Sequence, residues 1–164
     1  MQARLDEGPS VVTGEFTGAG LFQTRIAVRG GSILADEPVE VGGMASGPTP
    51  YELLSAALAA CTVMTLRLYA QRKGWELPPF HVEVAHSAPG EAQPRDHFSR
   101  VIVIGENVDP ERREKLLEIA GKCPVHRTLM RGFEISSSVA SREAPPGGEP
   151  ASQHMQDMSA ACED

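Results

Sequence analysis

Two cysteines that lie far apart in the chain, Cys61 and Cys123, are the residues whose type and setting could do chemistry. Cys61 lies inside the apolar run of residues 53–62, which has the composition of a helix, and Cys123 comes directly before Pro124. A cysteine reacts as its thiolate, so the surroundings of each sulfur decide whether it fills space or acts as a nucleophile. The two settings suggest two different roles and predict thiol redox chemistry.

The pKa of the two thiols is expected to differ. Cys61 would lie about three turns inside its helix, beyond the reach of the helix dipole, and apolar surroundings would raise its pKa. Its reactivity therefore requires a nearby cation or hydrogen-bond donor. Cys123 can be the N-cap of the next helix, where free backbone N–H groups face its sulfur. For each cysteine, a purely structural role remains the alternative.

Two residues near the start of the long helix are candidates to support Cys61. Glu52 is nine residues before Cys61, and at about 100° per residue the two side chains fall on opposite faces of an ideal helix. A capping role for Glu52 is therefore favoured. Tyr51 is closer to Cys61 in angle, although it is still about 80° away.

Three basic side chains are further candidates. Arg25 or Arg29 could reach a thiolate from a strand, although arginines on strands usually face solvent. His126, three residues after Cys123, could hydrogen-bond a thiolate. No spacing of His and Cys matches a recognised zinc site, so neither a metal nor another cofactor is expected.

Composition limits the class of protein. With 164 residues the chain is long enough for one domain and too short for two ordinary ones. A formal net charge of −7 argues against nucleic-acid binding, and no apolar run is expected to be long enough to cross a bilayer. The N-terminal residues lack a secretory signal pattern, so we expect a cytoplasmic location, where thiols are kept reduced.

The order of elements predicts an α+β fold. A long helix is expected from Pro50 to about Lys73, with Thr49 and Glu52 as its capping box. Because that helix is apolar on most of its circumference, it should be central and buried on nearly all sides, in part by a partner chain. Strands of a mostly antiparallel sheet are expected at 11–16, 22–28, 32–35, 80–85, 99–104 and 133–139, with further helices from Pro110 and at 125–129.

The chain is expected to form one domain over residues 1–140. Residues 141–164 are rich in Pro, Gly, Ser and Glu and show no hydrophobic periodicity, which predicts a disordered tail. Cys162, the third cysteine, would then be an incidental exposed thiol.

Two sequence motifs surround the paired cysteines. The first is Gly-Pro-Thr-Pro-Tyr-Glu-Leu-Leu over residues 47–54 followed by Ala-Ala-Cys-Thr over residues 59–62, and the second is Cys-Pro-Val-His-Arg-Thr-Leu over residues 123–129. In this order and separation they resemble the OsmC/Ohr family, and most closely an OsmC-like branch of it. The resemblance covers roughly residues 10–140 and implies an intertwined α+β homodimer whose long central helix carries the first cysteine.

The same resemblance implies a peroxidase reaction. Cys61 matches the peroxidatic cysteine of the family, whose thiolate attacks the O–O bond of a hydroperoxide to give a sulfenic acid and an alcohol. Cys123 matches the resolving cysteine, which condenses with the sulfenic acid to form a disulfide. A dithiol reductant, in this family typically a lipoylated protein, would restore both thiols.

The chain departs from the family pattern at one position. Family members place a glutamate ten residues before the first cysteine, where it orients an arginine toward the sulfur. Here that position is Tyr51, Glu52 is shifted by one residue, and Arg25 and Arg29 are the candidates for the arginine.

The leading hypothesis is a cytoplasmic thiol peroxidase that reduces organic hydroperoxides or hydrogen peroxide in defence against oxidative stress. One alternative is a non-catalytic protein whose cavity around Cys61 holds a small apolar ligand. Another is a redox sensor whose disulfide changes a contact with a partner. A depressed thiol pKa favours the peroxidase, whereas a pKa near or above the free value favours ligand binding.

Overall fold

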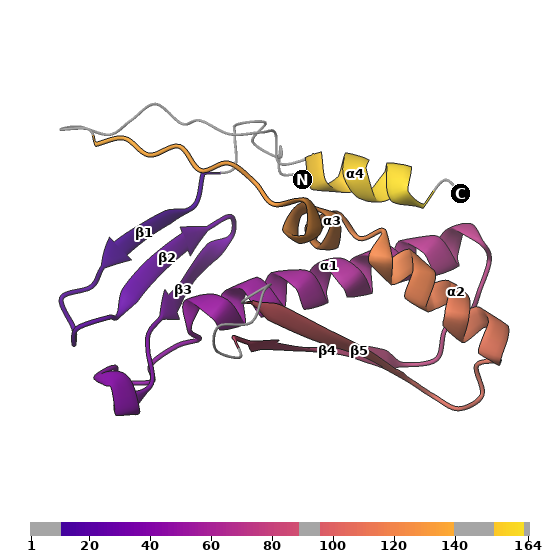
Figure 1. Ribbon diagram of the computed structural model, residues 1–164, viewed down its shortest axis with the longest axis horizontal. Coiled ribbons are helices and arrows are strands. Elements are labelled where there is room, and N and C mark those ends of the chain that lie inside the picture. Colours follow the sequence, from indigo (N-terminus) through magenta and orange to yellow (C-terminus); the bar gives the residue numbers. More distant parts are fainter. Residues whose placement is uncertain (1–10, 89–95, 140–152, 163–164) are drawn as a thin grey trace, which may run out of the picture. The chain divides into compact units, whose positions relative to one another are not determined.

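The chain falls into two compact units in the computed structural model, which describes residues 11–88, 96–139 and 153–162. The first unit holds residues 11–50, 135–139 and 153–154, and the second holds residues 51–88, 96–134 and 155–162. Each unit has its own antiparallel sheet, and helices make up much of the second (Figure 1). The predicted combination of helices with antiparallel strands is confirmed, while the single domain over residues 1–140 stays a prediction.

The first unit is a three-stranded meander. Its strands β1 (Thr13–Phe16), β2 (Thr24–Val28) and β3 (Gly31–Ala35) pair antiparallel in the order β1-β2-β3. Gly30, with a φ of 84°, makes the turn between β2 and β3, a conformation that glycine adopts without strain. A short 3-10 turn, η1 (Val39–Val41), follows the sheet.

The loop that precedes the long helix is held by one buried carboxylate, that of Asp36. It accepts hydrogen bonds from the backbone N–H groups of Glu37 at 2.9 Å, Met44 at 3.1 Å and Ser46 at 3.2 Å. The Ser46 hydroxyl donates a fourth bond at 2.7 Å. These donors, led by that hydroxyl, hold the pKa of Asp36 below its ordinary value, so the carboxylate stays ionised and fixes the loop.

The second unit is built on the long helix α1 (Pro50–Arg72). The hairpin of β4 (Phe80–Ser87) and β5 (His97–Ile104) follows it, and then α2 (Pro110–Gly121) and α3 (Pro124–Arg131). Asp109 caps α2 by accepting a hydrogen bond from the backbone N–H of Arg112 at 2.8 Å. The helix α4 (Gln153–Ala161) lies near the C-terminus (Figure 1).

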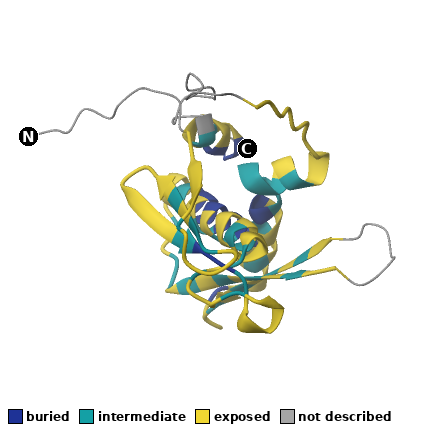
Figure 2. Cartoon of the chain, turned by 90° about the vertical axis from the view of Figure 1, so that its left-hand side faces the viewer, coloured by how far each residue is buried: buried dark blue, intermediate teal, exposed yellow. Residues whose placement is uncertain are grey.

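The core of the second unit joins α1 to α2 and to the end of α4. Figure 2 shows the buried residues of α1 in dark blue. Around them pack half-buried side chains of the hairpin and of the segment after α1. The buried members of this cluster are Leu66, Tyr69, Leu116, Ile119, Ala120 and Cys162.

The described chain by itself does not bury α1 on all sides. Tyr51, Leu54 and Met64 are about half exposed, because the hairpin, α2, α3 and α4 do not surround the helix. The expected partner chain remains a prediction.

The expectation that no apolar run could cross a bilayer is also wrong. Within the described residues, α1 is long and apolar enough by length and composition, with a mean hydropathy of 1.6 over its best window. The hydroxyls of Thr62 and Thr65 donate to the carbonyls of Leu58 and Cys61, so these two residues do not need water as a partner. Core helices of soluble proteins pass the same test, and 44% of this window is buried, so the signal is weak.

The predicted strand at residues 133–139 is absent. Residues 132–139 have no regular structure, and Phe133, Ile135 and Val139 are largely exposed. A strand needs a neighbouring strand to receive its hydrogen bonds, and neither sheet of the described chain pairs with this segment.

The predicted disorder near the C-terminus is wrong for residues 153–161, which form α4. Met158 and Cys162 are buried, and the guanidinium of Arg72 donates to the carbonyl of Ser159 at 2.8 Å. The thiol of Cys162 donates to the carbonyl of Thr65 at 3.8 Å, so this cysteine is not an exposed thiol. The remaining tail residues, 141–152 and 163–164, lie outside the described residues.

Candidate thiol redox site

The structure brings Cys61 of α1 and Cys123 together in the second unit. Their sulfurs are in hydrogen-bond contact, no disulfide joins them, and the residues are 2% and 0% exposed. With Leu58 they form a small buried cluster. Apolar side chains from three elements pack against it, so an apolar wall surrounds both sulfurs: Val84, Phe98, Val125 and Leu129.

Cys123 is the N-cap of α3, as the sequence predicts. Its backbone N–H donates to the carbonyl of Ala120 near the end of α2 at 3.3 Å, and its carbonyl accepts from the N–H of Arg127 at 3.0 Å. Pro124 occupies the first position of α3, where its missing N–H costs nothing. The side chain of Cys123 therefore lies at the positive end of a helix.

The pKa of Cys123 is lowered to about 6. The largest contribution is the hydrogen bond that the Cys61 thiol donates to the Cys123 sulfur. The backbone N–H groups of His126 and Val125 and the hydroxyl of Thr62 also favour the thiolate, whereas burial opposes it. At neutral pH the sulfur of Cys123 is therefore mostly ionised.

The pKa of Cys61 is raised, which agrees with the expectation for an apolar setting. The main cause is the hydrogen bond to Cys123, and burial and the negative charge on Cys123 act in the same direction. The backbone N–H of Val125 and the hydroxyl of Thr65 oppose the shift only in part. The two shifts oppose each other and belong to the coupled pair, in which Cys123 is the sulfur favoured as the thiolate.

We expect the ultraviolet absorbance of the thiolate to appear in one step near pH 6 when the reduced protein is titrated upward. A thiol whose pKa is lowered ionises at a lower pH than a free thiol, so the absorbance of the thiolate is present above pH 6 and lost below it. The step should be missing in Cys123→Ser and retained in Cys162→Ser, because burial raises the pKa of the Cys162 thiol. A wild-type titration with no step below pH 8 would contradict this charge distribution.

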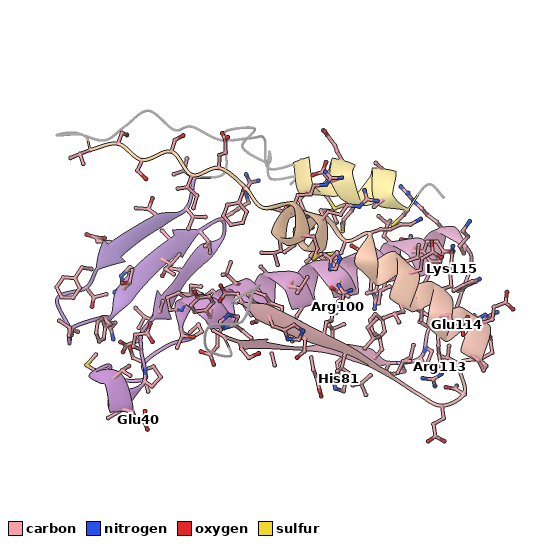
Figure 3. The ribbon with its side chains drawn as sticks, viewed as in Figure 1. Glu40, His81, Arg100, Arg113, Glu114 and Lys115 are labelled. Atoms are coloured by element: carbon pink, nitrogen blue, oxygen red, sulfur yellow. The ribbon has the colours of Figure 1, made fainter. Side chains whose placement is uncertain are left out.

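A third residue of the site is Arg100 of β5, which the sequence did not predict. Figure 3 shows its side chain beside α1. One guanidinium nitrogen, Nη1, donates to the hydroxyl of Thr62 at 3.1 Å and to the carbonyl of Ala120 at 3.0 Å. Burial lowers the pKa of Arg100, whereas the charges of Cys123 and Cys61 raise it. The guanidinium stays charged, as arginine does in proteins.

One signal in the sequence could have identified Arg100. Half-buried positions alternate with exposed ones along β5, and Arg100 shares the inner face with Phe98, Ile102 and Ile104. A charged residue in register with the apolar face of a strand is unusual and points to a specific partner.

Tyr51 connects to this site through aromatic rings. It stacks on His86, with ring centroids 4.0 Å apart and an interplanar angle of 4°. The ring of His86 contacts Phe98 at 4.8 Å, and its Nε2 lies 2.8 Å from Oδ1 of Asp96. Phe98 in turn packs against the cysteine cluster.

The other predicted support residues take different positions. Glu52 is exposed in the first turn of α1, and its capping role stays a prediction. His126 is half-buried, and burial, together with the charges of Arg100 and Arg127, lowers its pKa. Its backbone N–H is among the groups that lower the pKa of Cys123. Arg25 and Arg29 are exposed in the first unit, and their predicted approach to a thiolate is untested.

No group of three His, Cys, Asp or Glu side chains in the described part of the chain is arranged to hold a metal ion.

The family model of OsmC-like proteins matches residues 43–138, which include both cysteines and Arg100. The chain belongs to the OsmC-like family. No curated protein sequence matches this OsmC-like protein. The resemblance that the two motifs suggested is thus confirmed at the level of the family.

Solved structures with a similar fold share about a fifth of their residues with this OsmC-like protein. An OsmC-like protein from Mycoplasma pneumoniae aligns at 19% identity with a TM-score of 0.59, covering 74% of this chain and 86% of that one. An organic hydroperoxide resistance protein OsmC from Legionella pneumophila aligns at 19% identity with a TM-score of 0.55. The alignment covers 73% of this chain and 88% of that one. The organic hydroperoxide resistance protein OhrB of Bacillus subtilis aligns at 21% identity with a TM-score of 0.52. The alignment covers 75% of this chain and 90% of that one. At these identities the likeness shows the fold.

Proposed function

We propose that this protein is a thiol-dependent peroxidase that reduces organic hydroperoxides, or hydrogen peroxide, in defence against oxidative stress. The observation that carries the proposal is the buried pair of Cys61 and Cys123, whose sulfurs are in contact without a disulfide and whose environment lowers the pKa of Cys123. A thiolate is the nucleophile that the reaction needs, and a thiol in contact with it can close a disulfide. The names of two structural relatives, both organic hydroperoxide resistance proteins, support the same activity.

The proposed reaction has three balanced steps. The thiolate attacks one oxygen of the peroxide, the O–O bond breaks, and the leaving alkoxide takes a proton, which yields a sulfenic acid and an alcohol. The second sulfur then attacks the sulfenic sulfur and releases water as the disulfide forms. A dithiol reductant supplies two electrons and two protons and restores both thiols.

The family resemblance assigns the attack to Cys61 and the resolving step to Cys123. In the resting pair the negative charge lies on Cys123, so the assignment requires the shared proton to move from the Cys61 sulfur to the Cys123 sulfur. The two sulfurs are already hydrogen-bonded, which makes this transfer short. The raised pKa of Cys61 alone would favour a ligand-binding protein, but the lowered pKa of its neighbour supplies the pair with a thiolate.

The surroundings of the pair support an apolar substrate. The apolar side chains of Val84, Phe98, Val125 and Leu129 pack against the cluster that holds the two cysteines. Burial of an alkyl or aromatic group against such side chains is favourable by about 25 cal/mol per Å². Organic hydroperoxides should therefore be preferred over hydrogen peroxide.

The assembly and the reductant are part of the same proposal. The half-exposed apolar residues Tyr51, Leu54 and Met64 on α1 support a homodimer in which a second copy covers this helix. A lipoylated protein or a similar dithiol would reduce the disulfide in the cytoplasm.

The test is consumption of cumene hydroperoxide, tert-butyl hydroperoxide and hydrogen peroxide by the wild-type protein with dihydrolipoamide as reductant. We expect faster turnover of the two organic substrates, and a disulfide between Cys61 and Cys123 in the mass spectrum when the reductant is omitted. No consumption above buffer, together with unmodified cysteines in excess peroxide, would overturn the proposal in favour of ligand binding.

A further inference from the structure

Arg100 is a half-buried cation without a carboxylate partner in the part of the chain that the structure describes. It lies on the inner face of β5 beside the apolar residues Phe98 and Ile102, and the ion pairs of the described residues do not include it. Removing a charge from water without a counter-ion is costly. The fold therefore implies a negative charge close to this guanidinium.

Among the described residues, the cysteine pair can supply this negative charge as a thiolate. The charges of Cys123 and Cys61 both act on Arg100 and favour its charged form, and no carboxylate does so. With Cys123 ionised and Cys61 protonated, the guanidinium and the pair sum to zero charge. An uncharged pair would leave the arginine as an isolated cation.

Arg100 also connects the two segments that carry the cysteines. Its Nη1 donates to the hydroxyl of Thr62, the residue after Cys61 on α1. The same nitrogen donates to the carbonyl of Ala120, which also accepts the backbone N–H of Cys123. The planar guanidinium offers its donors in a fixed geometry, so both segments are held against one rigid group.

We propose that Arg100 is the counter-ion and positioning residue of the thiol pair, and that it holds Cys61 and Cys123 in register for disulfide formation. The effect on peroxide turnover rests on the proposed function. The ionisation of the pair and the closure of the disulfide do not, because both are measured without a hydroperoxide.

The test compares Arg100→Met and Arg100→Lys with the wild type by thiolate absorbance across pH, and by the rate of disulfide closure after addition of diamide. In Arg100→Met, which keeps the bulk and loses the charge, we expect the midpoint of Cys123 to rise by at least about one pH unit. Closure at pH 7 should slow by about tenfold. Arg100→Lys should keep the pH midpoint of Cys123 to within about half a pH unit. Its disulfide should still close slowly, because an ammonium does not offer the planar set of donors of a guanidinium.

Arg113→Met is the matched control. Arg113 is also half-buried, and it donates to the carbonyls of Val108 at 2.9 Å and Gly105 at 2.6 Å. It lies on α2, and Figure 3 labels both arginines. Its loss should lower thermal stability and leave the thiol midpoint and the closure rate unchanged.

Two results would overturn the proposal. The first is a folded Arg100→Met variant whose Cys123 ionises at the wild-type midpoint. The second is an Arg100→Lys variant that closes its disulfide at the wild-type rate, and this result decides the question if Arg100→Met fails to fold. A wild type that shows no peroxide turnover, combined with a shifted midpoint in Arg100→Met, would sink the peroxidase and leave this role of Arg100 intact. Peroxide turnover by the wild type, combined with an unshifted midpoint in Arg100→Met, would support the peroxidase and overturn this role of Arg100.

Discussion

Replacing either Cys61 or Cys123 with serine is expected to lower hydroperoxide turnover to below about 1% of the wild-type rate. A serine hydroxyl is neither ionised at neutral pH nor able to form a disulfide, so each variant loses one of the two chemical steps. Cys123→Ser should react once and stop as a sulfenic acid on Cys61. Dimedone trapping followed by mass spectrometry locates the modified sulfur.

The same experiment decides which sulfur attacks. A sulfenic acid on Cys123 in Cys61→Ser, with none on Cys61 in Cys123→Ser, would exchange the two roles that the family resemblance assigns. Cys162→Ser is the matched control and should keep full turnover, because Cys162 packs in the core cluster with Leu66 and Leu116 and its hydroxyl counterpart can still donate to the carbonyl of Thr65. Full turnover in both Cys61→Ser and Cys123→Ser would exclude the thiol mechanism.

Leu66→Ala is expected to give the largest loss of stability, about 2–5 kcal/mol. Leu66 is 0% exposed on α1 and packs in the core cluster with Tyr69, Ile119 and Cys162. Truncation leaves a cavity that these neighbours fill only in part. Thermal unfolding followed by circular dichroism should show a midpoint lower by on the order of 10 °C.

Leu117→Ala is the control for that substitution. Leu117 is 61% exposed on α2, and alanine is a good helix former, so the change in stability should stay within about 0.5 kcal/mol. Equal losses in the two variants would show that the cluster around Leu66 does not carry the stability of the second unit.

Local signals predicted most elements because each depended on neighbours in the sequence. Proline at the first helical position marked the starts of α1, α2 and α3, where its missing N–H and preset φ suit a helix. Alternation of apolar and polar residues marked β4 and β5, which pair antiparallel over their whole lengths. Cys123 could be predicted as an N-cap for the same reason, since capping depends on the residue and the proline after it.

Errors arose where structure depends on surfaces that are distant in the sequence. An apolar stretch at residues 133–139 predicted a strand, yet no strand of the described chain pairs with it. The short α4 has no strong periodicity of its own and is stabilised by burial of Met158 and Cys162 and by the bond from Arg72 to Ser159. Tertiary packing outweighed local propensity in both places.

The sequence by itself determined the helix that carries Cys61, the break that makes Cys123 an N-cap, and the family to which the chain belongs. Only the tertiary structure decided that the two sulfurs meet in one buried cluster and that Arg100 bonds to both segments that carry them. The physical reason is that pKa values and charge pairing depend on distances and burial. Contacts between α1, β5 and the junction of α2 and α3 set those quantities, and spacing along one chain does not encode them.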